Sequence, residues 1–294
     1  MRIAAAAGLS DTGRKRRRNE DAFVCRPPLF AVADGMGGAQ AGEVASRLAA
    51  AVLHEAPGGG LGEATIAALI EEANRRVWQR STEDTSHSGM GTTITVALAD
   101  AAAGTVAFGH VGDSRAYRIR DGALEQLTQD HSLVAELVRS GRLSPEEAET
   151  HPQRSVITRA LGTEPAVEVD LFTVEAHPGD LYLLCSDGLT TMVPDAEIRT
   201  LAEERRDDLD AAARALVAAA NAAGGEDNVT VVVFALDESD EPEPTAEPRP
   251  EPAAEAPPEP MRRHGAFAGG RLGGFAAIAA AALAALLLLW GLKR

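Results

Sequence analysis

The chain has 294 residues, of which 45% are hydrophobic but only 4% aromatic, so a core would be packed mainly by Ala, Leu, Val and Ile. Its formal net charge is −16 and its basic residues cluster only at 14–18, which argues against nucleic acid as a partner. Cys25 and Cys185 lie in apolar runs without the spacing of metal ligands or of a disulfide framework, which predicts small buried side chains in a reducing compartment. The apolar run at 1–11 is too short for a signal peptide, so we expect the N-terminal part to stay in the cytoplasm.

Residues 1–236 have the pattern of one globular domain. Runs rich in β-branched residues predict strands at 22–25, 29–33, 93–98, 105–111, 116–120, 181–185 and 229–235. Helical patterns are expected at 41–55, 62–82, 132–140, 145–149, 196–204 and 209–222. Short turns join several strands, and Asp121-Gly122 is typical of a hairpin, so at least part of the sheet is antiparallel. Because helices bracket blocks of strands instead of alternating with them, we expect an α+β fold.

Three segments depart from this domain pattern. Residues 128–166 are more polar and helical, which suggests a surface flap inserted between strands. The segment 237–260 carries nine acids and one arginine, and we expect 237–271 to be a disordered tether. The 21 residues 272–292 contain no charge and predict a transmembrane helix, with a buried core helix as the alternative and 293–294 as a short tail. Three cations before the span against two after it favour a single-pass protein with its catalytic domain in the cytoplasm.

The most informative stretch runs from Leu29 to Ser46. An apolar strand delivers Asp34 into Gly35, where a carboxylate and an exposed backbone oxygen suit a hard divalent cation, although Asp-Gly after a strand is more often a plain turn. Other acids share this position beside a strand end, namely Asp113, Asp187, Asp227 and the pair Glu20-Asp21. If these strand ends lie at one edge of a sandwich, the acids meet in one cleft.

Such a cluster fits phosphate ester chemistry. Mg²⁺ and Mn²⁺ prefer oxygen ligands and keep several waters. Two such ions about 4 Å apart, bridged by a carboxylate and a water, make hydroxide available near neutral pH to attack phosphorus. An arginine is well shaped to hold the phosphate, and Arg14, Arg16, Arg17 and Arg18 are candidates.

The sequence resembles the bacterial form of the PPM (PP2C) family of metal-dependent protein serine/threonine phosphatases. The matching segments are SDTGRKRRRNEDAF, VADGMGGAQAGEVAS, GMGTTITVAL, GHVGDSRAYRIRDGAL, LTQDHSLV, HPQRSVITRALG, LCSDGLT and GEDNVTVVV. They follow the family order and cover almost all of 8–236. The resemblance implies a PP2C-like β-sandwich of two antiparallel sheets flanked by helices, with the metal centre at one end and a monomeric catalytic domain.

The resemblance also implies the metal ligands. Asp34 would bridge two Mn²⁺ or Mg²⁺ ions, the Gly35 carbonyl would bind the second, and Asp187 and Asp227 would complete the pair. Asp21 would hold metal-bound water.

Further roles follow from the same motifs. Glu20 would be a supporting acid, Arg16 would bind the phosphate, and Asp113 with Asp187 would hold a third, weaker ion, which Ser155 would contact. The histidine that serves animal relatives as general acid is here Met36, so the proton must come from a metal-bound water or another residue. We expect Arg14, Arg17 and Arg18 to be solvated and to attract phosphorylated or acidic substrates.

The function implied is hydrolysis of phosphoserine and phosphothreonine in proteins by a metal-bridging hydroxide. By family analogy the enzyme opposes a bacterial serine/threonine kinase. Two alternatives stay open at this point. One is a non-enzymatic membrane-tethered adaptor of the same fold that binds phosphoproteins, and the other is an enzyme for a small phosphometabolite.

Overall fold

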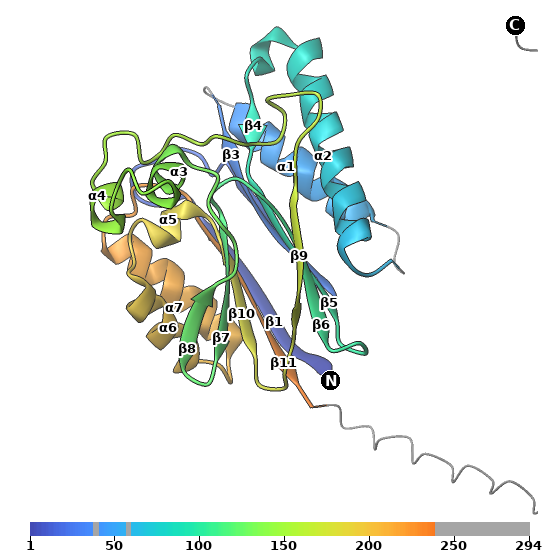
Figure 1. The fold of residues 1–294 in the computed structure, drawn as a ribbon, viewed down its shortest axis with the longest axis vertical. Coiled ribbons are helices and arrows are strands. Elements are labelled where there is room, and N and C mark those ends of the chain that lie inside the picture. The colour runs from blue at the N-terminus through green and yellow to red at the C-terminus, as the bar shows by residue number, and fades with distance from the viewer. Residues whose placement is uncertain (38–40, 57–59, 239–294) are drawn as a thin grey trace, which may run out of the picture. The chain divides into compact units, whose positions relative to one another are not determined.

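The structure is a computed structural model and describes residues 1–37, 41–56 and 60–238. Within them, two antiparallel sheets lie face to face and carry helices on their outer surfaces (Figure 1). This arrangement is the predicted α+β sandwich. The expected span at 272–292 and the tether before it lie outside the described residues. Among those that are described, no helix is both long and apolar enough to cross a membrane.

The first sheet has the strand order β1-β11-β10-β7-β8. Its strands are β1 (Arg2–Asp11), β11 (Val229–Asp237), β10 (Leu181–Cys185), β7 (Arg115–Arg120) and β8 (Ala123–Gln126). The second sheet has the order β2-β3-β5-β6-β9, with the short β4 paired to β3. Its strands are β2 (Asp21–Arg26), β3 (Leu29–Met36), β5 (Ile94–Asp100), β6 (Thr105–Val111), β9 (Asp170–Glu175) and β4 (Gly91–Thr92).

The helices divide between the two outer faces. The second sheet is covered by α1 (Ala41–Glu55) and α2 (Glu63–Glu83), which the short η1 (Thr85–His87) follows. The first sheet is covered by α5 (Asp187–Thr190), α6 (Asp195–Glu203) and α7 (Leu209–Ala222). The flap, residues 128–166, holds α3 (Leu133–Arg139) and α4 (Pro145–Glu149), and Ser144 begins α4 with a capping box.

Three apolar layers result, and β3 shows why its sequence is apolar throughout. Phe30 and Val32 belong to the core between the sheets, whereas Ala31 and Ala33 belong to the core beneath α1 and α2. Phe30 stacks on Phe234 of the opposite sheet with ring centroids 4.1 Å apart. Since both faces of β3 are buried, no polar alternation is possible along this strand.

Three strands were missing from the sequence prediction, namely β1, the two-residue β4 and β9. The alanine-rich start of the chain forms β1, which pairs along its length with β11. The edge strand β9 pairs with β6, and its side chains are only partly buried. The predicted hairpin at Asp121-Gly122 is confirmed: both residues have positive φ angles, of 50° and 75°, as a tight two-residue turn between β7 and β8 requires.

Candidate active site

The strand-end acids come from both sheets and gather at one end of the sandwich. Asp21 begins β2 and is paired in register with Asp34 near the end of β3. Asp113 follows β6, Asp187 follows β10, and Asp227 precedes β11. Burial raises the pKa of Asp34, and charge repulsion from all four of the other aspartates raises it further, so the sandwich does bring these acids together.

Asp21 shows how the two sheets meet. Its Oδ2 accepts hydrogen bonds from Ser186 Oγ at 2.9 Å, directly after β10 of the first sheet, and from Thr230 Oγ1 of β11 at 2.6 Å. Its Oδ1 is buried and has no partner in the described part of the chain, and the same is true of one carboxylate oxygen of Asp113 and of Asp187. A buried carboxylate oxygen without a donor is costly, so each of these oxygens is open to a cation.

Asp34 and Gly35 lie in the last part of β3, which is fixed through its main chain. The Asp34 carbonyl accepts hydrogen bonds from the Thr93 amide at 2.9 Å and from Thr92 Oγ1 at 2.8 Å. At Gly35 a Cβ atom would lie 2.2 Å from the Gly42 carbonyl oxygen, at the start of α1. Only glycine therefore fits between strand and helix at this point.

Burial and mutual repulsion raise the pKa values of the clustered acids. The pKa rises from 3.8 to about 7 for Asp21 and for Asp113 and to about 6 for Asp187, with desolvation as the largest cause and neighbouring carboxylates next among the raising causes. The pKa of Asp34 rises well above 3.8 for the same reasons, although its side chain keeps some contact with solvent. Carboxyl groups that resist ionisation together need positive charge among them.

The donor set fits divalent cations. Carboxylate oxygens are the ligands that Mg²⁺ and Mn²⁺ prefer, and three of them here are buried without a partner. Within the described residues, no three Asp, Glu, His or Cys side chains already surround a single point closely enough to hold an ion.

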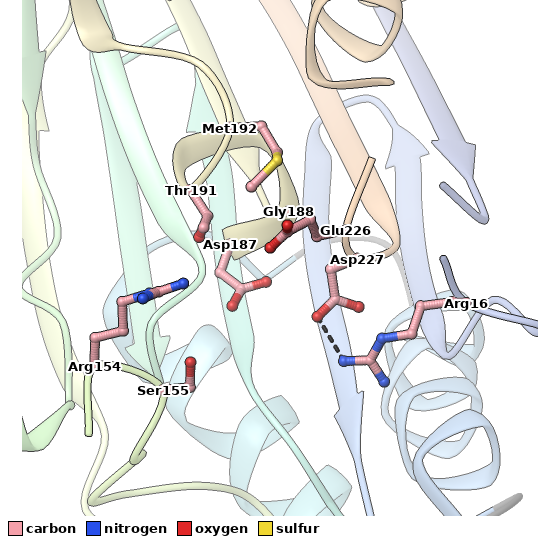
Figure 2. A pocket seen from close by; sticks show the side chains of 9 residues that line it. All are labelled: Arg16, Arg154, Ser155, Asp187, Gly188, Thr191, Met192, Glu226 and Asp227. Carbon is pink, nitrogen blue, oxygen red and sulfur yellow. Dashed lines mark hydrogen bonds and ion pairs between the residues drawn. The ribbon is translucent and has the colours of Figure 1, made fainter. Parts of the chain in front are cut away.

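A cleft of about 210 Å³ opens beside Asp187 and Asp227, and Figure 2 shows the side chains around it. Arg16 lines it and donates to Asp227 Oδ2 at 2.7 Å. Arg154 and Ser155, from the flap, line the opposite side. The cleft thus has Arg16 and Arg154 on two sides with Asp187 and Asp227 between them, and the two guanidinium groups suit a phosphate group.

The other residues predicted for the site are Glu20, Asp113, Ser155 and Met36. The amide of Glu20 donates to Asn228 Oδ1 at 2.8 Å, and burial raises the pKa of its half-buried carboxyl. Asp113, Asp187 and Ser155 were predicted around a third ion; Asp187 and Ser155 line the cleft, and Asp113 does not. Met36 lies at the end of β3, opposite Gly91.

Sequence reasoning gave no role to Arg154 or Asn228. Arg154 lies in the quoted motif HPQRS, and Asn228 in GEDNVTVVV, which was the only available signal. The Asn228 side chain donates to the carbonyls of Thr12 and Arg18, at 2.9 and 2.8 Å, and accepts from Glu20. It therefore fixes the loop that carries Arg16.

The two buried histidines have structural roles. His110 was expected to be packed and is fully buried, with Nδ1 2.9 Å from Thr95 Oγ1. His131 accepts from the Gly112 amide through Nδ1 at 3.0 Å, and its Nε2 lies 3.1 Å from Asp170 Oδ2. Its carbonyl accepts from the Thr158 amide at 2.8 Å, so His131 joins both ends of the flap to the turn before Asp113.

Several known proteins are similar to this chain in sequence and in fold. A model of the family described as protein phosphatase 2C matches residues 14–228. The serine/threonine phosphatase stp of Listeria monocytogenes is 41% identical over 245 residues, which are 78% of this chain and 94% of that protein. The serine/threonine protein phosphatase PstP of Mycobacterium tuberculosis is 45% identical over 231 residues, which are 77% of this chain and 44% of that longer protein.

Solved structures agree with these relatives. The crystal structure of M. tuberculosis PstP has a TM-score of 0.75 at 42% identity and covers 80% of this chain and 99% of that one. A PstP catalytic domain in complex with two manganese ions has a TM-score of 0.72 at 40% identity and covers 80% of this chain and 98% of that one. The chain therefore belongs to the protein phosphatase 2C family, and it is a protein serine/threonine phosphatase.

Proposed function

We propose that the domain hydrolyses phosphoserine and phosphothreonine in proteins with the help of Mn²⁺ or Mg²⁺ held by Asp34, Asp187 and Asp227, with the Gly35 carbonyl as a further ligand. The observation that carries this proposal is the gathering of acids from both sheets, of which Asp187 and Asp227 line a cleft whose sides carry Arg16 and Arg154. The PstP structure with two manganese ions supports the choice of metal. When bound, such ions supply an activated water and neutralise charge on the phosphate.

The protein's own residues have distinct tasks in this reaction. Arg16 is already aligned by its ion pair with Asp227, and its half-exposed guanidinium keeps further donors free for phosphate oxygens. Asp21, oriented by Ser186 and Thr230, presents one free oxygen that can accept a hydrogen bond from water. Met36 cannot donate a proton, so the leaving group must be protonated from elsewhere.

Replacing Asp34 by Asn tests the proposal directly. The Asp34→Asn variant should lose Mn²⁺-dependent release of phosphate from a phosphothreonine peptide, because the bridging carboxylate loses its charge. Asp121→Asn, the same change in an exposed hairpin turn, should keep full activity. Turnover by Asp34→Asn at the level of the unchanged enzyme would refute the binuclear site. A parallel assay with sugar phosphates would reveal a small phosphometabolite as the preferred substrate.

We further propose that 272–292 anchors the chain in the membrane, with the domain in the cytoplasm, where it would oppose a serine/threonine kinase. The uncharged run of 21 residues and the cations on both sides of it support the anchor. Fractionation of the full chain against a version ending at Glu238, which keeps all of β11, tests it. Equal recovery of both in the soluble fraction would refute the anchor.

A further inference from the structure

The loop that carries Arg16 is strongly basic, although the chain as a whole is acidic. We call residues 12–20, between β1 and β2, the basic loop; residues 14–18 read RKRRR, and all five are exposed. Three of these five cations have partners. Arg14 donates to the Asn221 carbonyl at 2.9 Å, Arg16 pairs with Asp227, and Arg18 lies 3.6 Å from Glu43.

Lys15 and Arg17 differ from these three residues in their contacts. Neither makes an ion pair or a side-chain hydrogen bond within the described part of the chain, and neither lines the cleft. They flank Arg16 directly in sequence, so their Cα atoms lie about 3.8 Å from that of Arg16. Arg14, Arg17 and Arg18 were expected to be solvated, and all three are exposed. Of these three, Arg17 alone has no side-chain partner among the described residues, and Lys15 joins it.

The basic loop is fixed before any substrate arrives. The Asn228 side chain binds the main chain at Thr12, Arg18 and Glu20. The Gly225 carbonyl accepts from the amides of Arg14 and Lys15 at 2.8 and 3.1 Å. Because a preformed loop loses little conformational entropy on binding, its free cations can add to affinity.

We propose that Lys15 and Arg17 dock acidic residues that flank the phosphorylated residue of the substrate protein. This rests on the proposed phosphatase activity, which brings the phosphate into the cleft beside Arg16 and Arg154. An extended peptide advances about 3.3 Å per residue, so side chains one to three positions from the phosphorylated residue reach the basic loop. The cleft itself carries three acids, Asp187, Glu226 and Asp227, against Arg16 and Arg154, so the attraction for an acidic flanking residue comes from Lys15 and Arg17 and not from the cleft.

We expect the enzyme to prefer substrates with acidic residues beside the phosphorylated residue, and not to attract acidic proteins in general. Since the formal net charge of the chain is −16, acidic substrates gain only from local contacts with the basic loop. One exposed cation paired with one carboxylate changes affinity by about two- to fivefold. Loss of both cations should therefore cost about four- to twenty-five-fold, and salt should weaken the preference in the unchanged enzyme.

The test compares two phosphothreonine peptides, one with acidic and one with neutral flanking residues, using the full chain with Mn²⁺ at low salt. In the double variant Lys15→Gln, Arg17→Gln, the ratio of the two kcat/KM values should fall by about four- to twenty-five-fold, through KM for the acidic peptide. The charge-conserving variant Lys15→Arg, Arg17→Lys should keep the ratio. A matched control, Arg75→Gln with Arg214→Gln on α2 and α7, removes the same charge away from the cleft and should also keep it.

An unchanged ratio in Lys15→Gln, Arg17→Gln would overturn the proposal, as would an equal fall in the matched control. Faster turnover of both peptides would also overturn it, because the basic loop would then hold the acidic stretch 237–260 of its own chain. If the unchanged enzyme released phosphate from neither peptide, the proposed function itself would fail, and that outcome is distinct from the others.

Discussion

Asp187→Asn should stabilise the metal-free protein while it weakens catalysis. Asp187 is the first residue of α5, and one of its carboxylate oxygens is buried without a partner among the described residues. Burial and the charge of Asp227 raise its pKa from 3.8 to about 6. Ionising it in the folded protein therefore costs free energy, at about 1.4 kcal/mol for each pKa unit.

The sign and size of the effect follow from this pKa. The raised pKa means that Asp187 contributes stability at low pH, below 3.8, and that this contribution is lost as pH rises through about 6. At pH 8 the loss amounts to about 3 kcal/mol. Neighbouring acids relax when one charge disappears, so we expect Asn to recover about 1 to 3 kcal/mol. For a domain of this size that is a rise in Tm of about 2 to 10 °C.

The difference in Tm is measured by thermal unfolding of residues 1–238 in the presence of a chelator, at pH 8 and at pH 5. Asp187→Asn should melt higher than the unchanged protein at pH 8, and the difference should shrink at pH 5, where the unchanged carboxyl is protonated in the folded state. Mn²⁺ should raise the Tm of the unchanged protein more than that of the variant, since one ligand is lost. Asp121→Asn is the matched control and should change neither. A lower Tm for Asp187→Asn at pH 8 without metal would refute the electrostatic reasoning.

Three further predictions concern the cleft and the flap. Arg16→Ala should raise KM for a phosphopeptide by about 10- to 100-fold, as expected for charged hydrogen bonds, with Mn²⁺ affinity little changed; an unaltered KM would give the role to a neighbouring arginine. Arg154→Ala should also raise KM, and a loss confined to metal affinity would contradict its place opposite Arg16. His131→Ala removes the bond to the Gly112 amide and should speed amide hydrogen exchange in the flap but not in β10 or β11; uniform exchange would mean that His131 does not hold the flap.

The positions of the acids could be predicted from sequence because each one ends or begins an apolar strand. That pattern is local, and the structure places Asp34, Asp113, Asp187 and Asp227 beside strand ends as expected. Their convergence is not local, because it depends on which sheet each strand joins. Only the resemblance to a known family supplied that information.

The strand β1 and the roles of Asn228 and Arg154 could not be predicted from local sequence patterns. The strand β1 is rich in alanine and only partly buried, so it lacks the alternation that marks a strand, and its pairing with β11 more than 200 residues away defines it. The Asn228 side chain forms hydrogen bonds with main-chain groups that lie 208 to 216 residues away in the sequence. A polar residue with such partners has no periodic signal in the sequence. The same holds for Arg154, whose place depends on how the flap folds over the cleft.

The polar end of the sandwich also explains how metal binding and folding are connected. The sheets pack through apolar residues such as Phe30 and Phe234, but at the active site Asp21 of one sheet is bonded to Ser186 and Thr230 of the other. Cations that bind acids from both sheets in the folded state alone must stabilise the contact between the sheets. The repulsion that weakens the metal-free protein is therefore the same interaction that gives the site its affinity for divalent cations.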